Sequence, residues 1–205
     1  MARATSLNIR FTEEGETPEP QRESLVTEDR AIYDELIAPL EDRMMRSIWR
    51  IVRNADLAED CLQDALAIIW KKRVKVCRHA NPPALILKIC LDAAYDSLRR
   101  LGRTRRHTDL SQLDNAPDSA GCNADRELQE RELEQQVQQA IRRLPRKRAL
   151  AIMMRLVREE PFEAIAQALD CSEVTARIHV SQGRAQLRKW LSPLCQSLRR
   201  EDENE

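Results

Sequence analysis

Residues 161–187 read PFEAIAQALDCSEVTARIHVSQGRAQL, and this segment is the most informative about the structure of the C-terminal half. Pro161 suits the start of a short helix, Asp170 and Cys171 suit a tight turn, and Ser172 is a good N-cap for a second helix. The second helix has small or apolar residues on one face, at spacings of four, three and four: Ala176, Val180, Gly183 and Leu187. This periodicity alone allows two interpretations, a helix-turn-helix that can enter a DNA major groove or a purely structural helical hairpin.

Apolar periodicity predicts helices in the rest of the chain as well. We expect them over 31–52, with a bend or division at Pro39, over 57–76, and over 84–101, where Gly102 is a stop signal. Upstream of the quoted stretch, a charged helix over 124–144 leads to a helix with apolar residues that we expect to be buried: Leu150, Ile152, Met153, Leu156 and Val157.

The expected fold is all-α, with two small helical domains joined by a flexible linker, the C-terminal one containing the helix-turn-helix. The expected boundaries are a disordered tail over 1–29, a first domain over 30–106, a linker over 107–127, a second domain over 128–195 and an acidic tail over 196–205.

The formal net charge of zero hides a segregation along the chain. Net charges are −4 over residues 1–29, +6 over 30–106, −6 over 107–140, +8 over 141–200 and −4 over 201–205. Two basic blocks separated by an acidic connector favour two modules that each meet a polyanion, although solvated helices also carry such excesses. No segment has the length and apolar character of a membrane span or secretory signal, so we expect a cytoplasmic protein without membrane insertion.

The residues offer no support for a catalytic, metal or cofactor site. The six cysteines contain no C-x-x-C pair, which argues against a zinc site or a disulfide framework, and we interpret them as small buried or incidental thiols. The three histidines, His79, His107 and His179, are far apart in sequence, and the four glycines form no phosphate-binding loop. We therefore expect no enzyme activity, no cofactor and no metal.

Three motifs together resemble the extracytoplasmic-function (ECF) sigma factors of bacterial RNA polymerase, within the sigma-70 family. The segment LAEDCLQDA at 57–65, followed by Trp70, is similar to the family's D-A-E-D-L-V-Q-E-x-F run. The segment NPPALILKICLD at 81–92, followed by DSLRR at 96–100, is similar to P-x-A-W-L-x-x-I-A-x-N and D-x-L-R-R. The third motif, similar to L-P, Y-E-E-I-A and S-x-G-T-V-K, combines LP at 144–145, FEAIA at 162–166 and SEVTAR at 172–177.

The resemblance implies that the first domain is sigma region 2, which docks on core RNA polymerase and helps to open the −10 promoter element. The second domain would be region 4, which reads the −35 element. The expected polymerase-binding residues form one polar face: Glu59, Asp60, Gln63 and Asp64. A helix start whose acids complement the helix dipole predicts the same acids without any partner.

The basic and loop residues of the first domain are the expected contacts to the −10 region: Lys71, Lys72, Arg73, Lys75, Arg78, His79, Asn81, Lys88, Arg99, Arg100 and Arg103. Among them Arg78, His79 and Asn81 form a candidate pocket for an unstacked base, although His79 also fits an ordinary solvated loop residue. The expected −35 contacts lie on the second helix of the helix-turn-helix: Ser172, Thr175, Arg177, Ile178, His179, Gln182, Arg184 and Arg188.

The chain departs from the family at positions that bear on promoter opening and reading. Leu85 stands where the family usually has Trp, and Asp92 where it usually has Asn. The added charge of Asp92 should repel DNA phosphate unless a neighbour pairs it. Asp170 and Val174 replace two usual glycines of the turn, and the outward face of the second helix has few basic residues.

The leading hypothesis is therefore a sigma factor that binds core RNA polymerase and directs transcription initiation at specific promoters. The alternative is a divergent sigma-like regulator that binds polymerase or another protein without directing initiation, for which the missing Trp and the weakly basic recognition face are the evidence. The expected partners are core RNA polymerase and promoter DNA. The resemblance also allows an inhibitory anti-sigma factor, although no residue requires one.

Overall fold

The fold is described from a computed structural model, with backbone for residues 30–108 and 124–202 and side chains for 30–103 and 130–192. Within these ranges all regular structure is helical, which confirms the predicted all-α class. The predicted tail over 1–29 and most of the predicted linker over 107–127 lie outside the described residues. The backbone of the last helix continues to Asp202, into the segment predicted as an acidic tail.

Residues 30–38 are a short helical unit of their own, separate from the compact unit that begins at Pro39. The π-helix η1 spans Tyr33–Ile37, and Arg30 and Asp34 form an exposed ion pair with a Nε to Oδ2 distance of 3.8 Å. The 3-10 helix η2 spans Ala38–Leu40 and contains Pro39, so the predicted division of the first helix at this proline is observed.

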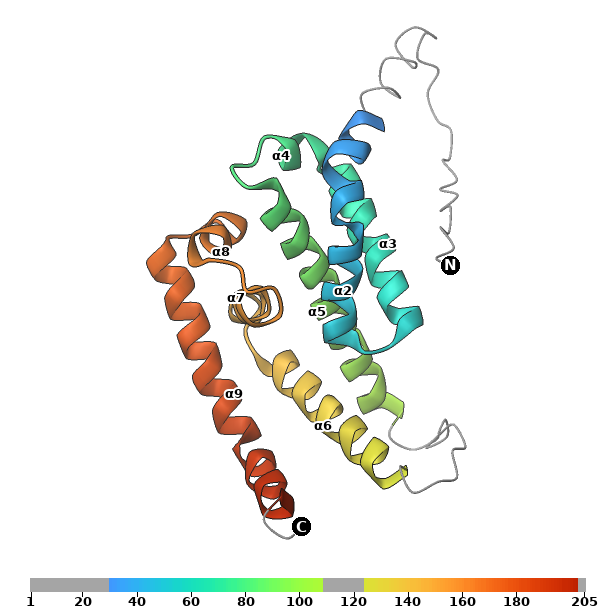
Figure 1. Ribbon diagram of the computed structural model, residues 1–205, viewed down its shortest axis with the longest axis vertical. Coiled ribbons are helices and arrows are strands. Elements are labelled where there is room, and N and C mark those ends of the chain that lie inside the picture. Colours follow the sequence, from blue (N-terminus) through green and yellow to red (C-terminus); the bar gives the residue numbers. More distant parts are fainter. Residues whose placement is uncertain (1–29, 109–123, 203–205) are drawn as a thin grey trace, which may run out of the picture. The chain divides into compact units, whose positions relative to one another are not determined.

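The N-terminal helices, by which we mean α2 to α5, are α2 (Glu41–Val52), α3 (Ala55–Lys71), α4 (Arg73–Cys77) and α5 (Pro82–Thr108). Helix α5 packs against both α2 and α3 (Figure 1). Arg53 ends α2 in the left-handed conformation, and the Asn54 side chain accepts a hydrogen bond from the Leu57 N–H to cap α3. The single helix predicted over 57–76 is wrong, because the chain breaks at Lys72 between α3 and α4.

The prediction that Gly102 stops α5 is also wrong, since the helix continues to Thr108. A Cβ at residue 102 would overlap the Arg142 guanidinium, with the Arg142 Cζ 2.9 Å away. Arg142 in turn donates from Nη1 to the Leu98 carbonyl at 3.5 Å. The glycine therefore gives room for an arginine of a neighbouring helix, which local sequence does not reveal.

The C-terminal helices, α6 to α9, are α6 (Ala124–Arg143), α7 (Arg146–Val157), α8 (Phe162–Leu169) and α9 (Glu173–Asp202). Helix α9 packs against α7 and α8 (Figure 1). Helix α7 is buried on most sides, as predicted for Leu150, Ile152 and Met153. Two residues depart from that prediction: Leu156 in the last turn is 49% exposed, and Val157 is only partly buried.

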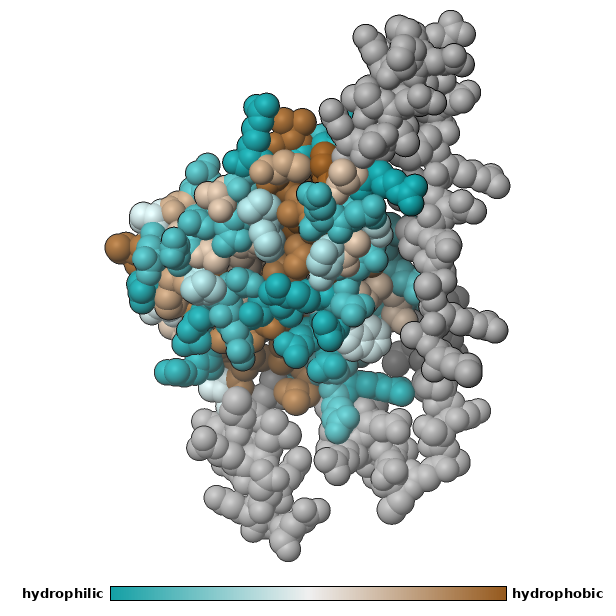
Figure 2. Space-filling model, turned by 45° about the horizontal axis from the view of Figure 1, so that its top comes forward, coloured by the Kyte–Doolittle hydropathy of each residue, from teal (hydrophilic) through white to brown (hydrophobic). Residues whose placement is uncertain are grey.

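The two groups of helices pack into one compact unit, formed by the described residues from Pro39 onward. Helix α5 contacts α6, α7 and α8 as well as its N-terminal neighbours, and Tyr95 at its centre is fully buried. The Tyr95 hydroxyl donates to the Leu144 carbonyl at 2.6 Å. The boundaries predicted at 106 and 128 stay a prediction. Figure 2 shows mostly hydrophilic side chains on the visible face, with apolar residues between them.

Candidate nucleic-acid and polymerase interface

One polar face of α3 carries the four residues predicted to bind polymerase, and all are exposed: Glu59, Asp60, Gln63 and Asp64. The opposite face is buried through Ala58, Cys61, Ala65 and Ile69. The helical period thus keeps the acids together and in solvent. Asp64 forms an exposed ion pair with Arg100, with 3.4 Å between Oδ2 and Nη2, so the face is not purely acidic.

Most of the basic residues predicted to meet the −10 region gather around α4 and the loop that follows. An open hollow of about 640 Å³ is lined by Lys71, Lys72, Val74, Lys75, Arg78 and His79. Arg73 lies over the Trp70 ring, 5.5 Å from its centroid, which is a cation–π geometry. The structure therefore brings these cations together on one surface, where they suit a phosphate backbone. Arg99, Arg100 and Arg103 lie further along α5, and all three are exposed.

His79 and Asn81 are engaged in local hydrogen bonds, rather than turned toward an open pocket. The Asn81 side chain accepts from the Ala84 N–H at 3.1 Å and so caps the start of α5. His79 Nδ1 accepts from the Asn81 N–H at 3.0 Å, and His79 Nε2 lies 3.1 Å from the Gln167 carbonyl of α8. With the proton on Nε2, both ring nitrogens are satisfied. A base pocket at this loop stays a prediction.

The helix-turn-helix forms from α8 and α9 as the quoted stretch predicts. Asp170 ends α8 with φ 52° and ψ 60°, so it takes over the left-handed role for which the family usually has glycine. The Ser172 hydroxyl accepts from the Thr175 N–H at 3.1 Å and caps α9. Ala176, Val180 and Gly183 are buried on the inner face, whereas Leu187 is only partly buried.

The outer face of α9 exposes most of the residues predicted to read the −35 element: Ser172, Arg177, Ile178, Gln182, Arg184 and Arg188. Two of the residues predicted to contact the −35 element are less accessible to DNA. Thr175 is partly buried, with its hydroxyl 2.8 Å from the Ser172 hydroxyl. His179 is partly buried, and its Nδ1 has no hydrogen-bond partner among the described residues. Burial, followed by the nearby charges of Arg148 and Lys147, lowers the pKa of His179.

Sequence reasoning did not identify Arg146 as a functional candidate. Its Nε donates to Asp92 Oδ1 at 2.8 Å, and its Nη1 and Nη2 donate to the two carboxylate oxygens of Asp96 at 3.0 and 2.8 Å. The Asp92 hydrogen bond, opposed by burial, is the main reason that the pKa of Arg146 is raised. Arg146 is thus the cation that pairs with the negative charge of Asp92, at a position where the resembled family usually has Asn. Its partner is 54 residues away in sequence, so no local signal could identify it.

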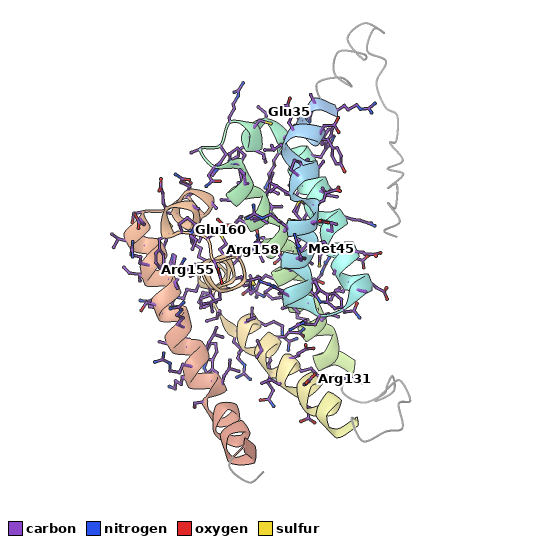
Figure 3. The ribbon with its side chains drawn as sticks, viewed as in Figure 1. Glu35, Met45, Arg131, Arg155, Arg158 and Glu160 are labelled. Carbon is purple, nitrogen blue, oxygen red and sulfur yellow. The ribbon has the colours of Figure 1, made fainter. Side chains whose placement is uncertain are left out.

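A second group of arginines lies where α2 meets the end of α7, around Arg155, Arg158 and Glu160 (Figure 3). Arg43 pairs with Glu160 at 3.5 Å, and Arg50 Nη1 donates to the Val157 carbonyl at 2.8 Å. Burial and then Arg43 lower the pKa of Arg158, and its Nε is buried without a hydrogen-bond partner among the described residues. The arrangement joins α2 to the loop before α8.

The described cysteines give no indication of chemistry. Cys61 and Cys90 are buried, Cys171 is partly buried and Cys77 is exposed; the side chains of Cys122 and Cys195 lie outside the described residues. Burial raises the pKa of Cys90 to about 12, which leaves it an unreactive thiol at neutral pH. In the described ranges no group of histidine, cysteine and acidic side chains could hold a metal ion. Nor does any helix there have the length and apolar character to cross a bilayer.

The segment that contains the helix-turn-helix is similar to a known family. Residues 134–187 match the family model for sigma-70 region 4. The ECF RNA polymerase sigma factor SigE of Mycolicibacterium smegmatis is 25% identical over 160 residues, which cover 78% of this chain and 62% of that protein. The RNA polymerase sigma-H factor of Pseudomonas aeruginosa is 26% identical over 173 residues, or 81% of this chain and 89% of that one. The C-terminal helices are thus similar to sigma-70 region 4, and most of the chain is similar to RNA polymerase sigma factors, one of them of ECF type.

Among solved structures, the chain is similar to the sigma factor RpoE in its complex with the anti-sigma factor NepR from Bartonella quintana. The TM-score is 0.43 at 19% identity, over 85% of this chain and 98% of that one. The segment that matches region 4 covers α7 and α8 together with parts of α6 and α9. The chain spans 62% of the length of the M. smegmatis relative.

Proposed function

We propose that this protein is an ECF-type sigma factor, which binds core RNA polymerase and directs transcription initiation at promoters with a −10 and a −35 element. The observation that carries the proposal is the helix-turn-helix of α8 and α9, which matches region 4 and exposes Gln182 and Arg184 on its outer face. Such a factor recruits the polymerase and reads DNA, and we assign it no catalytic reaction of its own. The proposed function requires the protein to be in the cytoplasm, where the bacterial chromosome lies.

The division of roles follows from the chemistry of each surface. The exposed acids and Gln63 on α3 suit basic polymerase residues, and charge of this kind steers association and orientation. The cations around α4 suit the phosphates of the opening strands. On α9, Gln182 can bond an adenine edge and Ile178 can contact a thymine methyl, while Arg177, Arg184 and Arg188 remain for phosphates.

A second candidate function has one observation in its favour. The exposed reading residues Ile178 and Gln182 carry no charge, and Arg177 is paired with Glu173, with 2.5 Å between Nη2 and Oε1. A weakly basic recognition helix is also what a regulator would have that binds polymerase without directing initiation. An anti-sigma partner stays a prediction under either candidate.

Run-off transcription with purified core RNA polymerase and a pool of genomic promoters tests the proposal. We expect discrete new starts that share two upstream elements only when the protein is present. The variant Asp60→Asn should weaken core binding, whereas the control Asp42→Asn, which changes an exposed acid on α2, should not. Stable core binding without new starts would favour the second candidate, and the absence of core binding would overturn both.

The same assay separates the residue of α9 that is proposed to contact bases from a residue proposed to contact phosphates. Gln182→Ala should relax the base preference at one −35 position, at a loss of about 1–3 kcal/mol of discrimination. Arg184→Ala should instead weaken binding to all sequences and reduce the slope of log K against log salt by about 0.9. Equal effects of the two variants on every promoter would contradict the assignment of this face.

A further inference from the structure

Two helices of the chain carry charges that are unfavourable when each helix is considered alone. Helix α7 begins with Arg146, Lys147 and Arg148 and has no acid in its first turn, although a helix N-terminus carries a partial positive charge. Helix α5 carries Asp92 and Asp96 four residues apart, and like charges at this spacing repel each other. Local propensity explains neither choice.

One contact between the helices resolves both mismatches. The Arg146 guanidinium bonds Asp96 through two parallel N–H groups and Asp92 through Nε, with distances of 2.8 to 3.0 Å. Lys88 also reaches Asp92, with 3.3 Å between Nζ and Oδ2. The Asp92 side chain is only 19% exposed, so its charge depends on these partners. The two acids bring negative charge to the start of α7, and Arg146 relieves the repulsion between them.

Neighbouring contacts extend this surface on both sides. On the same helix, Tyr95 is fully buried and its hydroxyl donates to the Leu144 carbonyl. At the far end of the surface, His79 Nε2 lies 3.1 Å from the Gln167 carbonyl of α8. The face of α5 that carries Asp92, Tyr95 and Asp96 is therefore a docking surface, and its occupant is the chain's own C-terminal helices.

We propose that Asp92, Asp96 and Arg146 form a latch that holds the C-terminal helices against α5 in the free chain, and that promoter binding requires its release. The inference rests on the proposed function. One predicted −10 contact is engaged by the C-terminal helices while the latch is closed: His79 Nε2 lies 3.1 Å from the Gln167 carbonyl of α8. Promoter phosphates are alternative partners for Arg146, so DNA and the latch compete for this cation.

The first test compares the full chain with two variants by small-angle X-ray scattering. Arg146→Glu places a negative charge against both acids and should increase the radius of gyration. Lys147→Glu makes the same charge change in the same turn of α7, at an exposed side chain, and should leave the radius unchanged. Combining Arg146→Glu with Asp96→Arg should restore most of the compaction. Circular dichroism checks that every variant keeps its helix content.

The salt dependence of the radius of gyration gives a second test, which is made on the unaltered chain and on Arg146→Glu. Raising the ionic strength screens a partly exposed ion pair, so it should expand the unaltered chain while the Arg146→Glu variant stays expanded throughout. In binding to promoter DNA, the double variant Asp92→Asn with Asp96→Asn, which weakens the latch and keeps Arg146, should show an apparent affinity about fivefold to tenfold higher, because a larger fraction of the chain is competent to bind. Identical scattering of both single variants, together with a radius independent of salt, would overturn the latch.

Transcription separates this inference from the proposed function. If the unaltered chain supports initiation but Arg146→Glu does not change its shape, the latch is refuted and the proposed function stands. If Arg146→Glu opens the chain but neither form supports initiation, the latch stands and the proposed function fails.

Discussion

Replacing Gly183 by alanine tests how closely α7 and α9 must approach. A Cβ at residue 183 would overlap the Cδ1 of Ile152 and lie 3.0 Å from its Cγ1, with the Arg148 carbonyl oxygen 3.7 Å away. Ile152 is 3% exposed, and as a β-branched residue in a helix it is largely restricted to one χ1 rotamer. The added methyl group must therefore displace either the isoleucine or α9 itself.

The two contributions to the stability change have opposite signs. Alanine in place of glycine inside a helix stabilises by about 1 kcal/mol through propensity alone. Overpacking a well-filled core destabilises by about 1–3 kcal/mol. Because the methyl group meets two atoms of one buried side chain, we take the middle of that range and expect a net loss of about 1 kcal/mol from Gly183→Ala.

Urea denaturation of the full chain, followed by circular dichroism, measures this loss, and a double-mutant cycle assigns its cause. Ile152→Val removes the Cδ1 that the new methyl group would meet, and should cost about 0.5–1.5 kcal/mol in the glycine background. In the alanine background the same change should cost less or stabilise, with a coupling energy of about 1 kcal/mol. If Gly183→Ala raised stability by the full propensity gain, the close approach of the two helices would be refuted.

Three further predictions concern single groups. Tyr95→Phe leaves the Leu144 carbonyl without its donor at a fully buried site, and should lower the free energy of unfolding by about 1–2 kcal/mol in denaturant titration; an unchanged midpoint would contradict this. Ser172→Ala removes the cap of α9 and should cost about 1 kcal/mol in the same titration, whereas Ser181→Ala, exposed within that helix, should be nearly neutral. Because the pKa of His179 is lowered in the folded chain, the unfolded chain binds more protons than the folded chain below pH 6.5. The free energy of unfolding should therefore decrease as the pH is lowered from 6.5, and should level off below the lowered pKa. His179→Asn should remove this pH dependence.

The sequence predicted those features that depend on neighbours in the chain. Ser172 as a cap, Asp170 in a left-handed turn and Gly183 on the inner face were all predictable, because capping, turn geometry and helical period are local properties. The exposed polar face of α3 was predictable for the same reason. A similar argument located the division at Pro39.

The features that the sequence did not predict depend on distant helices. Gly102 is a stop signal by local rules, but it faces Arg142, 40 residues further along the chain, and α5 continues through it. His79 fits a solvated loop until α8 brings the Gln167 carbonyl to it. The pairing of Arg146 with Asp92 needs both helices in place. Periodicity identifies which face of a helix is buried, but it does not identify the partner.

Helix α9 spans 30 residues, a length of about 45 Å, and contains Pro193, which has no N–H to donate to the helix. Its N-terminal turns carry the recognition face, and Gly183, the eleventh residue of the helix, lies on the inner face where α9 approaches Ile152 of α7. The crossing therefore lies nearer to the recognition end of α9 than to its C-terminal end. A change in the packing at Gly183 would move the recognition face relative to α7 without a direct contact to DNA.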